Sequence, residues 1–204
     1  MAALALGLSL GLLVVGCASQ KPSDAPALTV EEIKAIGEEQ MAQGNTTQAT
    51  ALADGIVEEA EYAAAFDDLS ACLVERGYPA PPSWTSPIDG HSILFEMQTG
   101  GRTVEEKERD TTECVTAHWE TVAAVYQDLV PFAMDEALRV NAVSCLNDLG
   151  YDLGGSESTP TEMGGPDALV DGVISDRAND AMDCLTDAQY ELFPEIPLVN
   201  ISIR

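Results

Sequence analysis

A chain of 204 residues, 46% of them hydrophobic, is long enough to form one domain or two small ones around an aliphatic core. Asp and Glu number 35 against nine Lys and Arg, which gives a formal net charge of −26. This charge argues against binding to nucleic-acid backbones and against electrostatic attraction to anionic lipids. It indicates a solvated, self-repelling surface, and leaves open weak divalent-cation binding or adaptation to salty surroundings.

Residues 1–16 form an apolar segment without charge. Its length, about 15 apolar residues, is short of the about 20 that a helix needs to span a bilayer. It is typical of the apolar region of a signal peptide. The sequence therefore predicts that residues 1–16 are a signal peptide.

The apolar segment ends in L-L-V-V-G-C at residues 12–17, which resembles the lipobox of bacterial lipoproteins. The resemblance implies that diacylglycerol is attached to the thiol of Cys17 and that the signal peptide is cleaved before it. One departure from the family's pattern is that no Lys or Arg precedes the apolar segment. The expected location is the extracytoplasmic face of the cell membrane, with the lipid on Cys17 as the membrane partner.

Counting the cysteines supports this assignment. Five cysteines are an odd number, and an unpaired cysteine in an exported chain needs an explanation. Lipidation of Cys17 leaves an even set: Cys72, Cys114, Cys145 and Cys184. Residues 17–28 then combine the lipidated cysteine with small residues and two prolines, a composition typical of a flexible tether.

The first half of the folded part is expected to be helical. Thr29 and Glu32 form a possible capping box for a helix that ends near residues 44–45. An Asp54-Gly55 turn precedes a helix over residues 58–76, whose apolar stripe is Tyr62, Phe66, Leu69 and Leu73. Gly55 and Glu61 have EF-hand spacing, but Leu52 stands at a ligand position, so a helix joint is favoured over a calcium loop.

The chain between residues 79 and 101 is rich in proline, which excludes helix. An Asp89-Gly90 turn and strand character at residues 92–97 predict a small hairpin. A second capping box at Thr103 predicts one helix to about Leu129.

The rest of the chain repeats this layout. A further helix is expected from Pro131 to about residue 149, followed by a breaker-rich loop at residues 154–166. A last helix is expected over residues 167–193, and residues 198–203 alternate as in a short strand.

The pattern C-L-x-x-x-G-Y occurs twice, at residues 72–78 and 145–151. The following cysteines, Cys114 and Cys184, lie 42 and 39 positions after the first cysteine of each copy. Duplication explains this near-register repeat. Four cysteines allow three pairings, and duplication favours Cys72–Cys114 and Cys145–Cys184.

The predicted fold is mainly α with small β elements, built from two tandem helix–insert–helix units that are each closed by one disulfide. The predicted boundaries place an N-terminal helical segment at residues 29–57, the first unit at 58–130 and the second at 131–204. Apart from the lipobox, composition and cysteine layout resemble those of small secreted lipoproteins of high-GC Gram-positive bacteria. This resemblance implies a location and no activity.

No catalytic, cofactor-binding or metal-binding residue is assigned. His91 and His118 match no metal or catalytic motif and are expected at the surface or an interface. Trp84 and Trp119 are expected to pack in the core, although they could line a groove. The leading hypothesis is a non-catalytic module that binds a protein or small molecule. The alternative is a hydrolase of envelope polymers that uses acidic residues.

Overall fold

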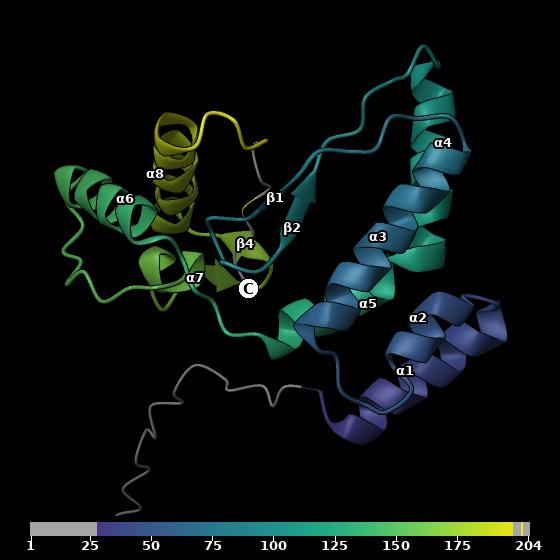
Figure 1. The fold of residues 1–204 in the computed structure, drawn as a ribbon. Helices are drawn as coiled ribbons and strands as arrows, with labels where there is room; N and C mark the ends of the chain where they lie inside the picture. The colour runs from purple at the N-terminus through teal and green to yellow at the C-terminus, as the bar shows by residue number, and fades with distance from the viewer. Residues whose placement is uncertain (1–27, 198–200, 202–204) are drawn as a thin grey trace, which may run out of the picture.

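The computed structural model describes residues 28–197 and residue 201. The described chain is mainly helical, with two short antiparallel hairpins (Figure 1). The helices are α1 (Val30–Gln43), α2 (Thr46–Ala51), α3 (Glu59–Glu75), α4 (Val104–His118), α5 (Glu120–Leu129), α6 (Glu136–Asp148), α7 (Pro160–Gly164) and α8 (Asp176–Leu192). The hairpins pair β1 (Ser83–Thr85) with β2 (Ile93–Phe95), and β3 (Leu169–Val170) with β4 (Val173–Ile174).

The predicted fold class and both predicted disulfides are confirmed. Cys72 is bonded to Cys114, and Cys145 is bonded to Cys184. The signal peptide and nearly all of the tether lie outside the described residues. So does the strand predicted at residues 198–203, except for Ile201.

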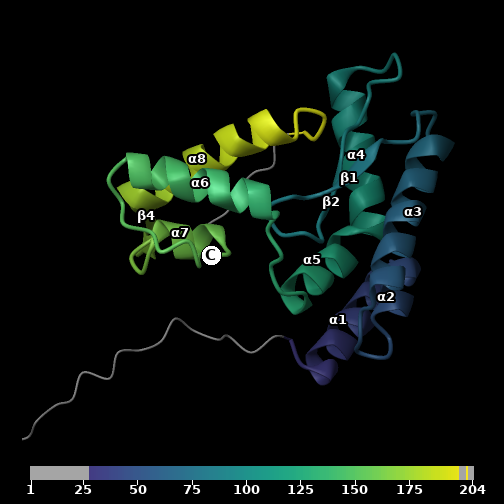
Figure 2. The same cartoon turned by 60° about the vertical axis from the view of Figure 1, so that its left-hand side comes forward.

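The helices form two groups with separate hydrophobic cores (Figures 1 and 2). Helices α1 to α5 enclose a core rich in aromatic side chains, which include Tyr62, Phe66, Trp119 and Tyr126. Helices α6, α7 and α8 enclose a second, largely aliphatic core, which includes Leu138, Leu146, Met163 and Leu185. Each disulfide therefore cross-links two helices of one group: α3 to α4, and α6 to α8.

The β1–β2 hairpin lies between the two groups and touches both cores. Its strand residues Ile93 and Phe95 pack against the first core, whereas Ile88, in the connecting loop, is buried in the second. Two backbone hydrogen bonds tie this loop to the segment before α6: Ala133 N–H to the Asp89 carbonyl at 2.8 Å and Asp135 N–H to the Pro87 carbonyl at 2.9 Å. The predicted hairpin is thus present and also connects the two helix groups.

The single helix predicted over residues 103–129 is wrong, because it is divided at Trp119 into α4 and α5. The cause is Gln48, a fully buried side chain of α2. Its Oε1 accepts the Thr121 N–H at 2.7 Å and the Val122 N–H at 3.2 Å, and its Nε2 donates to the Thr116 carbonyl at 2.7 Å. These backbone groups would otherwise bond one another or their neighbours within a continuous helix. A side chain that bonds them instead stabilises a break in the helix.

Two predicted helix starts are also wrong, because a capping side chain places each start further along. Helix α6 does not start at Pro131, since Asp135 accepts the N–H groups of Ala137 and Leu138. Helix α8 starts after Ser175, whose hydroxyl accepts the Ala178 N–H. The preceding residues form the β3–β4 hairpin, whose Asp171-Gly172 turn has positive φ at both positions (51° and 78°).

Candidate functional site

Both copies of C-L-x-x-x-G-Y have the same backbone geometry. Gly77 and Gly150 adopt left-handed φ values of 91° and 96°, as expected of glycine after a helix. The next residue in each copy returns its N–H to the helix, Tyr78 to the Leu73 carbonyl and Tyr151 to the Leu146 carbonyl, both at 3.1 Å. The motif is therefore a repeated helix end, with a disulfide-bonded cysteine in the helix and a tyrosine directly after the left-handed glycine.

The tyrosine of each copy also has the same partners. Tyr78 donates its hydroxyl hydrogen bond to Asp110 at 2.9 Å, and Tyr151 donates to Asp180 at 2.6 Å. A guanidinium lies over each ring, Arg102 at 5.5 Å and Arg177 at 5.7 Å from the ring centroid. Each aspartate stands four residues before the second cysteine, so D-x-x-x-C was a further repeated signal that sequence reasoning missed.

The first copy of this cluster is self-contained. Asp110 is 5% exposed, and it bonds the guanidinium of Arg109 at 2.8 Å as well as Tyr78. These two hydrogen bonds, Arg109 first, lower the pKa of the Asp110 carboxyl. Burial, followed by the bond to Asp110, raises the pKa of Tyr78. Because these groups bond one another, the cluster is a structural joint between α3 and α4.

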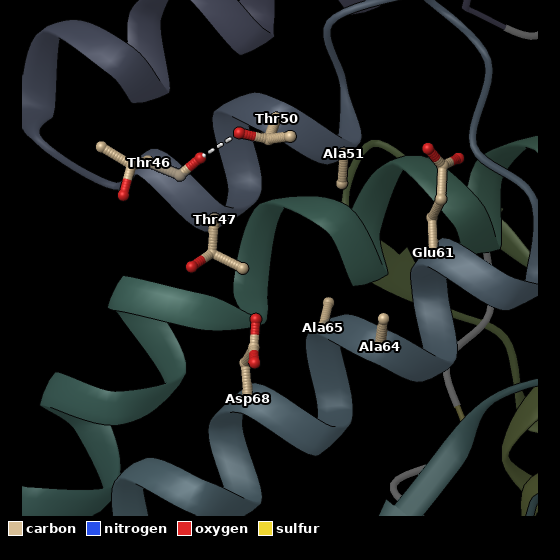
Figure 3. Close-up of a pocket in the computed structure, with 8 residues that line it drawn as sticks. All are labelled: Thr46, Thr47, Thr50, Ala51, Glu61, Ala64, Ala65 and Asp68. Atoms are coloured by element: carbon tan, nitrogen blue, oxygen red, sulfur yellow. Dashed lines mark hydrogen bonds between the residues drawn. The ribbon is translucent and has the colours of Figure 1, made fainter.

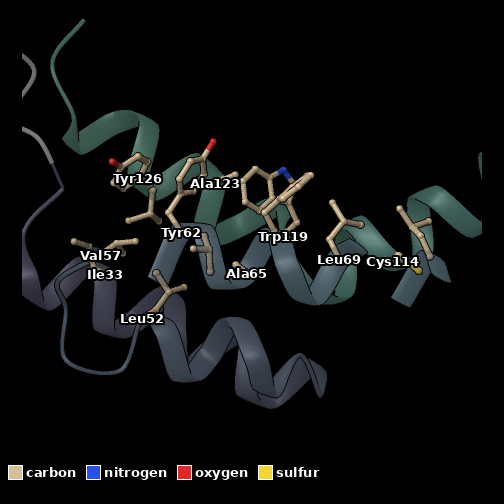
Figure 4. Packing of buried hydrophobic residues seen from close by; sticks show 14 of the residues in the cluster. Ile33, Leu52, Val57, Tyr62, Ala65, Leu69, Cys114, Trp119, Ala123 and Tyr126 are labelled. Carbon is tan, nitrogen blue, oxygen red and sulfur yellow. The ribbon is translucent and has the colours of Figure 1, made fainter. Parts of the chain in front are cut away.

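A pocket of about 340 Å³ lies between α3, α5 and the β1–β2 hairpin. It is lined by Glu59, Tyr62, Ala63, Thr85, Gly90, His91, Ile93, Tyr126 and Val130. Figure 4 shows Tyr62 and Tyr126 side by side in the first core, with Trp119 beyond Tyr62. The rings of Tyr62 and Tyr126 are stacked with centroids 4.2 Å apart, and His91 meets Tyr126 edge-on at 6.0 Å. The pocket with these nine lining residues is called the aromatic pocket below.

The electrostatics of the aromatic pocket follow from its lining. Burial, with the Glu59 charge as the second cause, raises the pKa of Tyr126. Burial likewise raises the pKa of Tyr62, although its hydroxyl oxygen accepts the Ile93 N–H at 2.8 Å. The Nδ1 atom of His91 lies 2.9 Å from the Asp89 carbonyl oxygen, which can only accept. Nδ1 is therefore the donor in this hydrogen bond.

A second, more open hollow of about 420 Å³ separates α2 from α3. Figure 3 shows Thr47 and Ala51 of α2 facing Ala64, Ala65 and Asp68 of α3 across it. Two small side chains in the middle of the α3 face leave this space, and the carboxylates Glu61 and Asp68 flank them. It is called the α2–α3 groove below.

The carboxylates of the α2–α3 groove are far apart for paired acid chemistry. Glu61 and Asp68 are two helical turns apart on one helix, a rise of about 10 Å. Glu61 is also held by the α3 cap, because it accepts the Glu58 N–H at 2.9 Å. Glycosidases place their carboxyl groups about 5–9.5 Å apart on opposite sides of a bond. The groove therefore offers no close pair of carboxylates.

The structure places the remaining predicted residues as follows. Cys17 lies outside the described residues. Trp119 is buried in the first core, whereas Trp84 is half-buried. Half-buried His118 adjoins the break between α4 and α5, and its Nδ1 atom is buried without a hydrogen-bond partner. His91 faces the aromatic pocket, a role that its sequence context did not reveal.

The segment with EF-hand spacing between Gly55 and Glu61 does not have the geometry of a ligand loop. Leu52, at a would-be ligand position, is fully buried in the first core. Within residues 28–197, no three His, Cys, Asp or Glu side chains are grouped so that they could hold a metal ion.

No helix in the described part of the chain is both long and apolar enough to span a bilayer. Comparisons with protein-family models, curated proteins and solved structures found no match to this chain.

Proposed function

We propose that this protein is a non-catalytic binding module, held at the extracytoplasmic face of a cell membrane by lipid on Cys17. The observation that supports binding is the aromatic pocket, where Tyr126, His91 and Glu59 converge on about 340 Å³. A concave site with apolar walls and a few polar groups is the usual form of a small-ligand site. Its volume is near the lower end of the range for such sites, about 300–1,000 Å³, which fits a small ligand.

The frame around the aromatic pocket supports the same proposal. Helix α3 contributes Glu59, Tyr62 and Ala63, and the Cys72–Cys114 disulfide joins this helix to α4. The hairpin wall is fixed by the Tyr62 hydroxyl, which bonds the N–H of Ile93. A site built on cross-linked elements keeps its shape without a ligand, which lowers the entropy cost of binding. Oxidised cysteines also agree with an exported location.

The alternative function, hydrolysis of envelope polymers, has weaker support. Of the two hollows described here, the α2–α3 groove holds two carboxylates, but both come from one helix, with a rise of about 10 Å between their backbone positions. One of them, Glu61, is engaged in the helix cap. The binding proposal therefore has the better geometric basis.

A matched pair of substitutions tests the binding proposal. Ala63 and Ala64 are adjacent exposed residues of α3, and they line the aromatic pocket and the α2–α3 groove respectively. Ala63→Phe should fill the aromatic pocket, whereas Ala64→Phe should fill the groove. In a thermal-shift screen of small ligands, we expect compounds that stabilise the native protein and Ala64→Phe but not Ala63→Phe.

Two outcomes would count against the proposal. Ligands that still stabilise Ala63→Phe would show that the aromatic pocket is not their site. Release of soluble fragments from envelope polymers, lost in Asp68→Asn, would instead favour the hydrolase.

A further inference from the structure

We propose that the aromatic pocket binds a small organic cation through its ammonium group. This inference rests on the proposed function, because it names the ligand class for the same pocket.

The lining of the aromatic pocket is acidic. Glu59 is the acidic member of the lining, and none of the nine lining residues is Lys or Arg. His91 donates from Nδ1 to the Asp89 carbonyl, so this nitrogen is already paired within the hairpin loop. The net charge of −26 strengthens the preference, since the field of the whole protein raises the local concentration of cations.

The walls suit an ammonium group better than a metal ion. Tyr126 is the aromatic wall, because the ring of Tyr62 is enclosed between those of Tyr126 and Trp119. Cations are attracted to such a ring at distances up to about 6 Å. A hard metal ion needs several oxygen ligands, whereas the pocket offers a single carboxylate. An anion would have to lie beside the Glu59 carboxylate, at an electrostatic cost.

The size of the pocket limits the ligand. A volume of 340 Å³ lies near the lower end of the range of about 300–1,000 Å³ found for small-ligand sites. A ligand of this volume is a small amine or a quaternary ammonium compound. A polymer chain could place only a terminal or side-chain amine in it.

The test uses choline as the cationic probe. Its neutral isostere is 3,3-dimethylbutanol, and 3,3-dimethylbutyrate is an anion of similar shape. Each is titrated by calorimetry into the full-length protein in a nonionic detergent. We expect choline to bind about tenfold more tightly than the neutral isostere, and the anion to bind most weakly.

The matched charge variants are Glu59→Gln and Asp68→Asn. Both remove one exposed carboxylate from α3, but only Glu59 lines the aromatic pocket. We expect Glu59→Gln to weaken choline binding about fivefold or more, and Asp68→Asn to leave it nearly unchanged.

Three results would overturn the inference: no choline binding at millimolar concentration, equal binding of the neutral isostere, or equal choline binding by Glu59→Gln. If other ligands still lose their binding in Ala63→Phe, the cation inference fails while the proposed function stands. If no ligand discriminates Ala63→Phe from Ala64→Phe, the proposed function fails as well.

Discussion

Asp110 shows how one residue connects the repeated motif to the stability of the first helix group. It is almost fully buried at the join of α3 and α4, where it accepts hydrogen bonds from Arg109 and Tyr78. These partners stabilise the charged carboxylate and hold its pKa below the ordinary value of about 3.9.

The lowered pKa of Asp110 makes the stability depend on pH. The Asp110 carboxyl takes up a proton at higher pH in the unfolded chain than in the folded chain. Its contribution to the free energy of unfolding is therefore fully present above pH about 4. This contribution is lost as pH falls through the pKa that Asp110 has in the folded chain.

We therefore expect Asp110→Asn to flatten the fall of the unfolding midpoint in urea between about pH 5 and pH 2. Asp67→Asn, which removes an exposed carboxylate from α3, serves as the control. An Asp110→Asn profile as steep as that of the native chain would contradict this account.

Single residues also show why the sequence predicted the disulfides but not the aromatic pocket. The pairing of Cys72 with Cys114 could be predicted from the duplication, because cysteines at equivalent positions of the two copies form equivalent disulfides. The aromatic pocket could not be predicted, since Glu59, His91 and Tyr126 come from three different elements. Their sequence neighbourhoods hold no motif, and only the packing of the hairpin against α3 and α5 brings them together.

At the scale of elements, the break between α4 and α5 depends on Gln48. Its fully buried amide bonds Thr116, Thr121 and Val122, which satisfies backbone groups that the interrupted helix leaves without helical partners. We expect Gln48→Ala to lower the free energy of unfolding by about 2–4 kcal/mol, because buried donors would lose their acceptor.

Urea unfolding followed by circular dichroism measures this effect of Gln48. Gln43→Ala is the control, because it removes an exposed amide that bonds Glu39 on α1. We expect that change to cost well under 1 kcal/mol. Equal stability of the two variants would show that Gln48 does not maintain the break.

The helices were predictable where the signal is local, and were missed where it is not. The capping boxes at Thr29 and Thr103 are formed as the sequence indicates. The continuous apolar face of residues 103–129 predicted one helix, but the residue that divides it lies 68 positions earlier than its partner Thr116. No local window can contain such a long-range contact.

At the scale of the whole molecule, the β1–β2 hairpin connects the two helix groups. Ile88 is 5% exposed and packs in the second core, while Ile93 packs against the first. We expect Ile88→Ala to cost about 2–4 kcal/mol and to reduce the cooperativity between the two groups. Val74→Ala, at an exposed position of α3, is the matched control.

The effect of Ile88→Ala can be followed by amide hydrogen exchange. Protection should fall in α6 and α8 of the variant while α3 and α5 keep theirs. A uniform loss across both groups would contradict this expectation, because it would show that the two groups unfold as one cooperative unit.

We propose that lipid on Cys17 holds this disulfide-closed binding module at a membrane face. The most direct test of this proposal follows the full-length protein in a bacterial host, with a clickable fatty-acid label and fractionation of cells. The account predicts that the native chain and Gly16→Ala, which keeps a small residue before the cysteine, are labelled and sediment with membranes. Cys17→Ala should lose both the label and its cleaved, membrane-anchored form. Unchanged labelling and membrane partition of Cys17→Ala would contradict the claim.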